Sequence, residues 1–158
     1  MAETTVRATP DAELLEATLD AALDAARAGD AARVGALLDP VHPADVADLL
    51  EQVSETDREA LLAMGSAVID GEVLSEISDA IREDVLDALS DDIVAEALRE
   101  LDSDDLVDIV EDLEAADQGR LLGAMDAADR VAVEQALAWP EGSAGRLMQR
   151  ELVVAPEH

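Results

Sequence analysis

The chain of 158 residues contains no cysteine, which excludes disulfides, thiolate metal sites and cysteine nucleophiles. Phenylalanine and tyrosine are also absent and tryptophan occurs once, so any core must be aliphatic. No apolar run reaches the roughly 18 residues that a membrane-spanning helix needs, and the first residues do not resemble a signal peptide. These absences predict one soluble, intracellular domain of ordinary size.

Lysine is missing as well, and 10 arginines face 39 acidic residues, for a formal net charge of −29. Because phosphate binding needs clustered cationic side chains, nucleic acid is not expected as a partner, nor is direct insertion into a membrane. Acidity on this scale attracts cations or basic proteins. Adaptation to salt or a coding bias explains the charge equally well, so composition leaves both a sensing role and salt adaptation open.

Signatures of catalysis are absent too. The sequence has no HExxH motif, Walker loop, GxSxG elbow or Rossmann fingerprint. Its two histidines, His42 and His158, lie far apart, so a zinc site is not expected. Carboxylates are abundant, but nothing marks one pair as buried or perturbed. The sequence therefore predicts that the chain is not an enzyme.

What the chain does contain is a twelve-residue repeat. An apolar residue followed by a short acidic or hydroxyl residue recurs at Leu89, Leu101, Leu113 and Met125, and the same frame extends back to Gly29. The second motif residue is Asp or Ser at seven of nine positions, namely 30, 54, 66, 78, 90, 102 and 126. Such side-chain oxygens accept hydrogen bonds from the unpaired N–H groups of a first helical turn. The repeat therefore predicts one helix for every twelve residues.

Helices of about 9 residues are marginal alone, so neighbouring helices must stack on one another. We expect an all-α fold, a right-handed superhelix of about ten short helices. Residues 1–9 are expected to be a disordered lead and residues 10–138 the helical domain. Residues 139–158 are expected to be a linker and the start of a further domain that the chain cuts short, because Leu152-Val153-Val154 resembles a strand with no partner.

The repeat unit from residue 66 to residue 77 is predicted to be the weakest. Ser66 occupies its cap position, and Gly71 then falls inside the helix. Glycine in a helix interior costs about 1 kcal/mol relative to alanine. We therefore expect this helix to be the least stable of the series.

Three stretches of the sequence resemble one known family. The tail Trp139-Pro140-Glu141-Gly142-Ser143-Ala144-Gly145-Arg146-Leu147-Met148 resembles the junction between the cytosolic N domain and the first CBS domain of MgtE-type magnesium transporters. Val41-His42-Pro43-Ala44-Asp45 resembles that family's His-Pro helix start, and Leu101-Asp102-Ser103-Asp104-Asp105-Leu106-Val107-Asp108 resembles its acidic helix. Short acidic helical repeats also occur in the flagellar switch protein FliG. The alternative is therefore a helical-repeat scaffold for protein interactions, FliG-like or an adaptor.

The resemblance implies a role for the chain. The intact protein would be a homodimeric magnesium transporter at the bacterial inner membrane, and this chain would be its Mg²⁺-sensing lobe on the cytoplasmic face. Its implied partners are the CBS domains and the membrane domain of the same transporter. In that family, Mg²⁺ bound between the acidic N domain and the CBS domains helps to close the gate.

Asp104, Asp108 and Asp112 are the candidate metal ligands. Their spacing places them on one face of a helix, where like charges repel one another and a bound cation would relieve the repulsion. Mg²⁺ suits such a face because it takes oxygen ligands and keeps several waters, and other divalent cations are also compatible with it. The spacing is equally typical of a solvated acidic face with diffuse counterions. The resemblance adds Glu72, which corresponds to an acidic position that the family uses at its domain interface.

Overall fold

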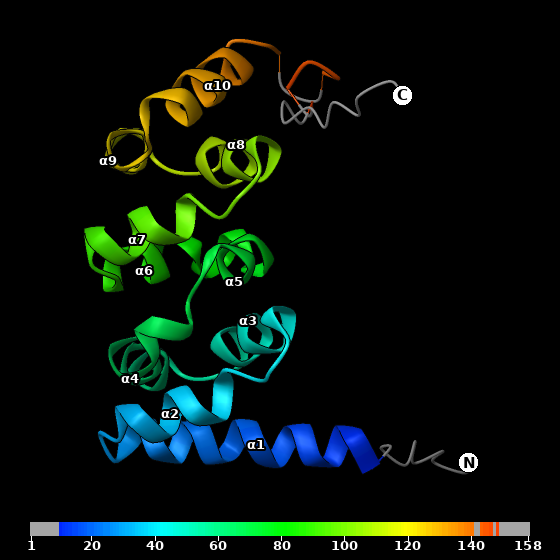
Figure 1. Ribbon diagram of the computed structural model, residues 1–158, viewed down its shortest axis with the longest axis vertical. Helices are drawn as coiled ribbons and strands as arrows, with labels where there is room; N and C mark the ends of the chain where they lie inside the picture. The colour runs from blue at the N-terminus through cyan, green and yellow to red at the C-terminus, as the bar shows by residue number, and fades with distance from the viewer. Residues whose placement is uncertain (1–9, 141–142, 147, 149–158) are drawn as a thin grey trace, which may run out of the picture. The chain divides into compact units, whose positions relative to one another are not determined.

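The computed structural model describes residues 10–140, 143–146 and 148 (Figure 1). These residues form ten α-helices and one 3₁₀ turn, and no strand occurs among them. The predicted all-α class and helix number are therefore confirmed. The predicted disordered lead and the predicted strand lie outside the described residues. None of the helices within the described ranges is both long and apolar enough to cross a bilayer.

The helices fall into two compact units, Met1–Val68 and Ile69–His158. Unit 1 contains α1 (Pro10–Arg27), α2 (Ala31–Leu38), α3 (Pro43–Gln52), α4 (Glu55–Gly65) and the 3₁₀ turn η1 (Ser66–Val68). Unit 2 contains α5 (Gly71–Glu76), α6 (Asp79–Ala88), α7 (Asp91–Leu98), α8 (Ser103–Glu111), α9 (Ala115–Ala124) and α10 (Ala127–Leu137).

Side-chain caps explain where many of the helices begin. In the described chain an oxygen or imidazole acceptor receives a hydrogen bond from a first-turn N–H at Asp30, His42, Ser54, Asp70 and Asp126. Ser90 precedes α7 with the same extended backbone, but within the described residues its hydroxyl makes no capping hydrogen bond. A helix therefore begins directly after nearly every cap position that the repeat predicts, although not every cap side chain hydrogen-bonds to the first turn.

Unit 1 is built around the long helix α1, which packs against α2 and α4. Gly29 ends the α1 region because its φ of 74° is a left-handed conformation that favours glycine. The turn returns the N–H of Asp30 to the carbonyl of Ala25 at 3.0 Å. The contact surface is rich in small residues, since Ala22, Ala25 and Ala26 are all buried. The helices of this unit can therefore approach closely without aromatic side chains.

One predicted boundary was wrong. Ser66 ends α4 and begins η1, and α5 begins only at Gly71, behind the cap residue Asp70. Gly71 is therefore the first residue of its helix and not an interior weakness. A Cβ atom added there would lie 2.6 Å from the carbonyl oxygen of Ala97 in α7. The glycine permits a close contact between α5 and α7 that the repeat pattern did not reveal.

Candidate metal-binding face of helix α8

Helix α8 carries three of the four predicted ligands. Its apolar side chains are buried in the core of unit 2, which leaves the acidic side chains on its outer surface. Asp104 lies in the first turn, Asp108 lies one turn later, and Asp112 is the C-cap residue. The side chains of Asp108 and Asp112 are 64 % and 47 % exposed. The acidic face is therefore open to solvent at Asp108 and Asp112, whereas Asp104 is partly buried.

A buried arginine lies beneath this face, and the sequence analysis missed it. The side chain of Arg82 on α6 is only 5 % exposed, and its Nη1 lies 2.6 Å from Oδ1 of Asp79. Its Nη2 lies 3.8 Å from Oδ2 of Asp108, and its Nη1 lies 3.8 Å from Oδ2 of Asp112. Nη2 also donates a hydrogen bond of 2.9 Å to the carbonyl of Ile77. The face thus has an internal cation.

A signal for this arginine exists in the sequence. Arg82 precedes Val85 and Leu86 by three and four residues, which places all three on one side of a helix. Val85 and Leu86 are buried, and Arg82 is buried with them. An arginine on an apolar helical face requires a partner, because an unpaired buried charge is very costly. That requirement points to nearby carboxylates, although it does not say which ones.

The electrostatics of α8 are dominated by like charges. Burial raises the pKa of Asp112, and the neighbouring carboxylates of Asp79 and Glu111 raise it further, while Arg82 acts in the opposite direction. Burial also raises the pKa of Asp105, and the carboxylate of Asp104 adds to that effect. Negative charge on this helix is therefore only partly balanced by the protein.

The C-terminal end of α8 has a second arginine beside it. Arg146 pairs through Nε with the carboxylate of Glu111, and its Nη1 donates a hydrogen bond of 3.0 Å to the carbonyl of Trp139. The side chains of Arg146 and Glu111 are 14 % and 21 % exposed. Glu111 is therefore engaged by a cation from the chain, whereas Asp108 is 64 % exposed and lies 3.8 Å from its nearest cation.

Glu72 lies in the first turn of α5 and is exposed. Across the described residues, no three carboxylate or imidazole groups converge closely enough to hold a metal ion among them. Mg²⁺ does not require such a cluster, since it often takes one or two carboxylates and completes its shell with water. The carboxylates of Asp104 and Asp108 fit that donor chemistry.

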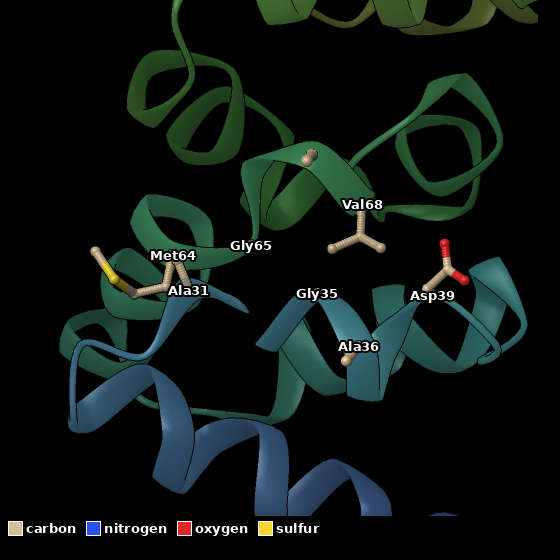
Figure 2. Close-up of a pocket in the computed structure, with 8 residues that line it drawn as sticks. Ala31, Gly35, Ala36, Asp39, Met64, Gly65 and Val68 are labelled. Carbon is tan, nitrogen blue, oxygen red and sulfur yellow. The ribbon is translucent and has the colours of Figure 1, made fainter. Parts of the chain in front are cut away.

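A pocket of about 330 Å³ lies in unit 1, whereas the four predicted ligands belong to unit 2 (Figure 2). Helix α2 and the α4–η1 segment line it, with the residues Ala31, Gly35, Ala36, Asp39, Met64, Gly65, Ala67 and Val68. Figure 2 shows the side chain of Val68 pointing towards α2. Among these lining residues Asp39 alone carries a charge, so the pocket brings no set of reactive groups together.

The fold and its exposed carboxylates define an acidic helical-repeat domain. Residues 41–142 match the family model of the MgtE intracellular N domain. The chain belongs to this family. The family resemblance is thereby confirmed over a range that includes the His-Pro helix start and the acidic helix, and the family's intracellular location agrees with the predicted one. The junction with a CBS domain that the tail resembles stays a prediction. The match favours an MgtE-type N domain over a FliG-like scaffold.

Solved structures share the fold. The soluble part of a magnesium transporter has a TM-score of 0.73 and 18 % identity, over 88 % of this chain and 55 % of that one. The cytosolic domain of the Mg²⁺ channel MgtE in complex with ATP has a TM-score of 0.70 and 27 % identity, over 83 % of this chain and 54 % of that one. The chain thus spans about half the length of these relatives. No curated protein matches the chain.

Proposed function

We propose that this chain is the Mg²⁺-sensing regulatory domain of a magnesium transporter, with a regulatory and not a catalytic role. The observation that carries the proposal is the geometry of α8. Asp104 and Asp108 lie one turn apart on the side of the helix opposite its buried apolar residues. Membership of the MgtE intracellular N domain family supplies the context in which such a face has a function.

The mechanism follows from charge. A net charge of −29 makes this domain repel any other acidic surface when cations are scarce. Mg²⁺ bound at Asp104 and Asp108 lowers that repulsion, so the domain can pack against the CBS domains of the same transporter and favour a closed gate. Glu72 is the second position proposed to face that interface. In the intact protein this arrangement is expected twice, because the proposed transporter is a homodimer with a membrane domain.

The test separates specific binding from salt screening. Mg²⁺ should raise the melting temperature of the chain more than NaCl does at equal ionic strength. A ligand that binds only the folded state stabilises it by RT ln(1 + [L]/Kd), about 1.4 kcal/mol at ten times Kd. Screening of surface charge is generic and does not distinguish the two salts in this way.

The key variant combines Asp104→Asn with Asp108→Asn and should abolish the Mg²⁺-specific part of the shift. A matched control combines Glu16→Gln with Asp20→Asn, two exposed acids at the same spacing on α1. The control removes the same charge and should keep the Mg²⁺ response. If wild type responds equally to the two salts, or the control loses the response as fully as the α8 variant, the sensor assignment is wrong.

A further inference from the structure

We propose that Arg82 is a built-in counterion that competes with divalent cations for Asp108 and Asp112, and so sets the Mg²⁺ concentration at which the α8 face binds. The inference rests on the proposed function, because it concerns the same face. It assigns a role to a residue of α6 that is not itself a ligand.

The position of Arg82 is fixed by its burial. The guanidinium is held by Asp79 at 2.6 Å and by the carbonyl of Ile77 at 2.9 Å, with the side chain 5 % exposed. Arginine remains protonated at all ordinary pH values, so the charge cannot be removed by releasing a proton. The protein therefore keeps a permanent positive charge directly beneath α8.

The contacts of Arg82 with the carboxylates of α8 are longer than its contacts with Asp79 and Ile77. Both distances, from Arg82 to Asp108 and to Asp112, are 3.8 Å, which is longer than a hydrogen bond. Nε and Nη1 of Arg82 are buried without a well-aligned hydrogen bond among the described groups, and Nη1 is paired by charge with Asp79 at 2.6 Å. The two carboxylates are attracted to Arg82 by charge but are not locked to it. Since each is about half exposed or more, each can also turn towards solvent.

Competition follows from this arrangement. A divalent cation bound at Asp104 and Asp108 must draw Asp108 away from a charge that already attracts it, and a cation that also engages Asp112 must do the same there. Removing one unit charge at about 4 Å from partly exposed carboxylates should strengthen divalent binding by about 5- to 10-fold. Arg82 thus keeps the face unoccupied until the Mg²⁺ concentration is high enough to compete.

The primary experiment is calorimetric titration of the 158-residue chain with MgCl₂ at constant ionic strength. Arg82→Gln should lower the Kd by about 5- to 10-fold, whereas Arg82→Lys keeps the charge and should remain within about twofold of wild type. The control is Arg99→Gln, which makes the same charge change at an exposed arginine paired with Glu96. It should leave the Kd within about twofold of wild type.

A second variant covers the case in which Arg82→Gln does not fold. Asp79→Asn keeps a side-chain oxygen that can accept a hydrogen bond from the buried guanidinium, and the position is 67 % exposed, so we expect this variant to fold. Without its nearest carboxylate, Arg82 attracts Asp108 and Asp112 more strongly, and the affinity for Mg²⁺ should fall. Asp92→Asn, at an exposed acid of α7, removes the same charge and should lower the affinity less.

Wild type itself offers a third readout. In an NMR titration the side-chain Nε–H signal of Arg82 should shift with Mg²⁺ and reach half of its full shift at the calorimetric Kd, while that of Arg99 should not shift. Mg²⁺ binding that depends on Asp104 and Asp108, combined with no effect of Arg82→Gln or Asp79→Asn, overturns the role of Arg82 and leaves the sensor function standing. Binding that appears only in Arg82→Gln supports the competition and overturns the sensor function in this chain. No binding in any variant overturns both.

Discussion

Arg27 of α1 binds Asp57 of α4 through two parallel hydrogen bonds, Nε to Oδ1 at 2.8 Å and Nη2 to Oδ2 at 2.9 Å. Asp57 also accepts a hydrogen bond of 2.9 Å from the hydroxyl of Ser54, the cap residue of α4. One carboxylate therefore joins the start of α4 to the end of α1. Bidentate pairs of this geometry are among the stronger polar contacts in proteins.

The first prediction concerns pH. The hydrogen bond from Arg27, followed by that from Ser54, lowers the pKa of Asp57 from 3.8 to about 2. A carboxyl with a lowered folded-state pKa stabilises the fold above its unfolded pKa, and this stabilisation is lost as the pH falls through the folded value. Asp57→Asn should therefore lower the free energy of unfolding at pH 7. The difference from wild type should shrink between pH 4 and pH 2 in urea unfolding experiments, and a constant difference would contradict the assignment.

A second prediction concerns Asp105, whose pKa is shifted in the opposite direction. Burial and the carboxylate of Asp104 raise it above 3.8, so the folded state holds the proton more tightly than the unfolded state does. The charged form then costs stability at neutral pH; the cost declines as the pH falls through the folded pKa and is gone below the unfolded value of 3.8. Asp105→Asn should stabilise the chain at pH 7 and have no such effect at pH 3. Thermal unfolding at the two pH values checks the sign.

Glycine substitutions give a third prediction, with opposite signs at two sites. Gly71→Ala should destabilise the chain by about 1–3 kcal/mol, because its Cβ would lie 2.6 Å from the backbone oxygen of Ala97. Gly119→Ala, in the interior of α9, meets no atom within 4 Å and should stabilise the chain by about 1 kcal/mol. Urea unfolding measures both. Equal effects at the two positions would show that α5 and α7 are not in close contact.

Helix caps provide the fourth prediction. Asp126 accepts hydrogen bonds from the N–H groups of Ala128 at 2.8 Å and Asp129 at 3.1 Å, so Asp126→Ala should cost about 1 kcal/mol. Ser90→Ala should cost less than half of that, because within the described residues the Ser90 hydroxyl makes no capping hydrogen bond. Urea unfolding of the two variants measures both changes in the free energy of unfolding. A larger cost at Ser90 would contradict the cap assignment.

The sequence by itself determined the helices and most of their boundaries. A cap such as Ser54 bonds an N–H only three residues away, so its geometry is encoded locally and is visible as a spacing. The acidic face of α8 was predictable for the same reason, because residues one turn apart lie together on any helix. The family could also be identified from local motifs.

Tertiary structure decided what the spacing could not express. The shift of one helix start from Ser66 to Asp70 accompanies the contact of Gly71 with α7, a packing relationship between residues distant in sequence. The partners of Arg82 depend equally on how α6 lies against α8. A repeat fixes which residues share a helical face, because the geometry of one turn is the same everywhere. The repeat does not fix which helical faces meet, because that depends on packing between helices. The buried charge of Arg82 beneath α8 is a result of that packing.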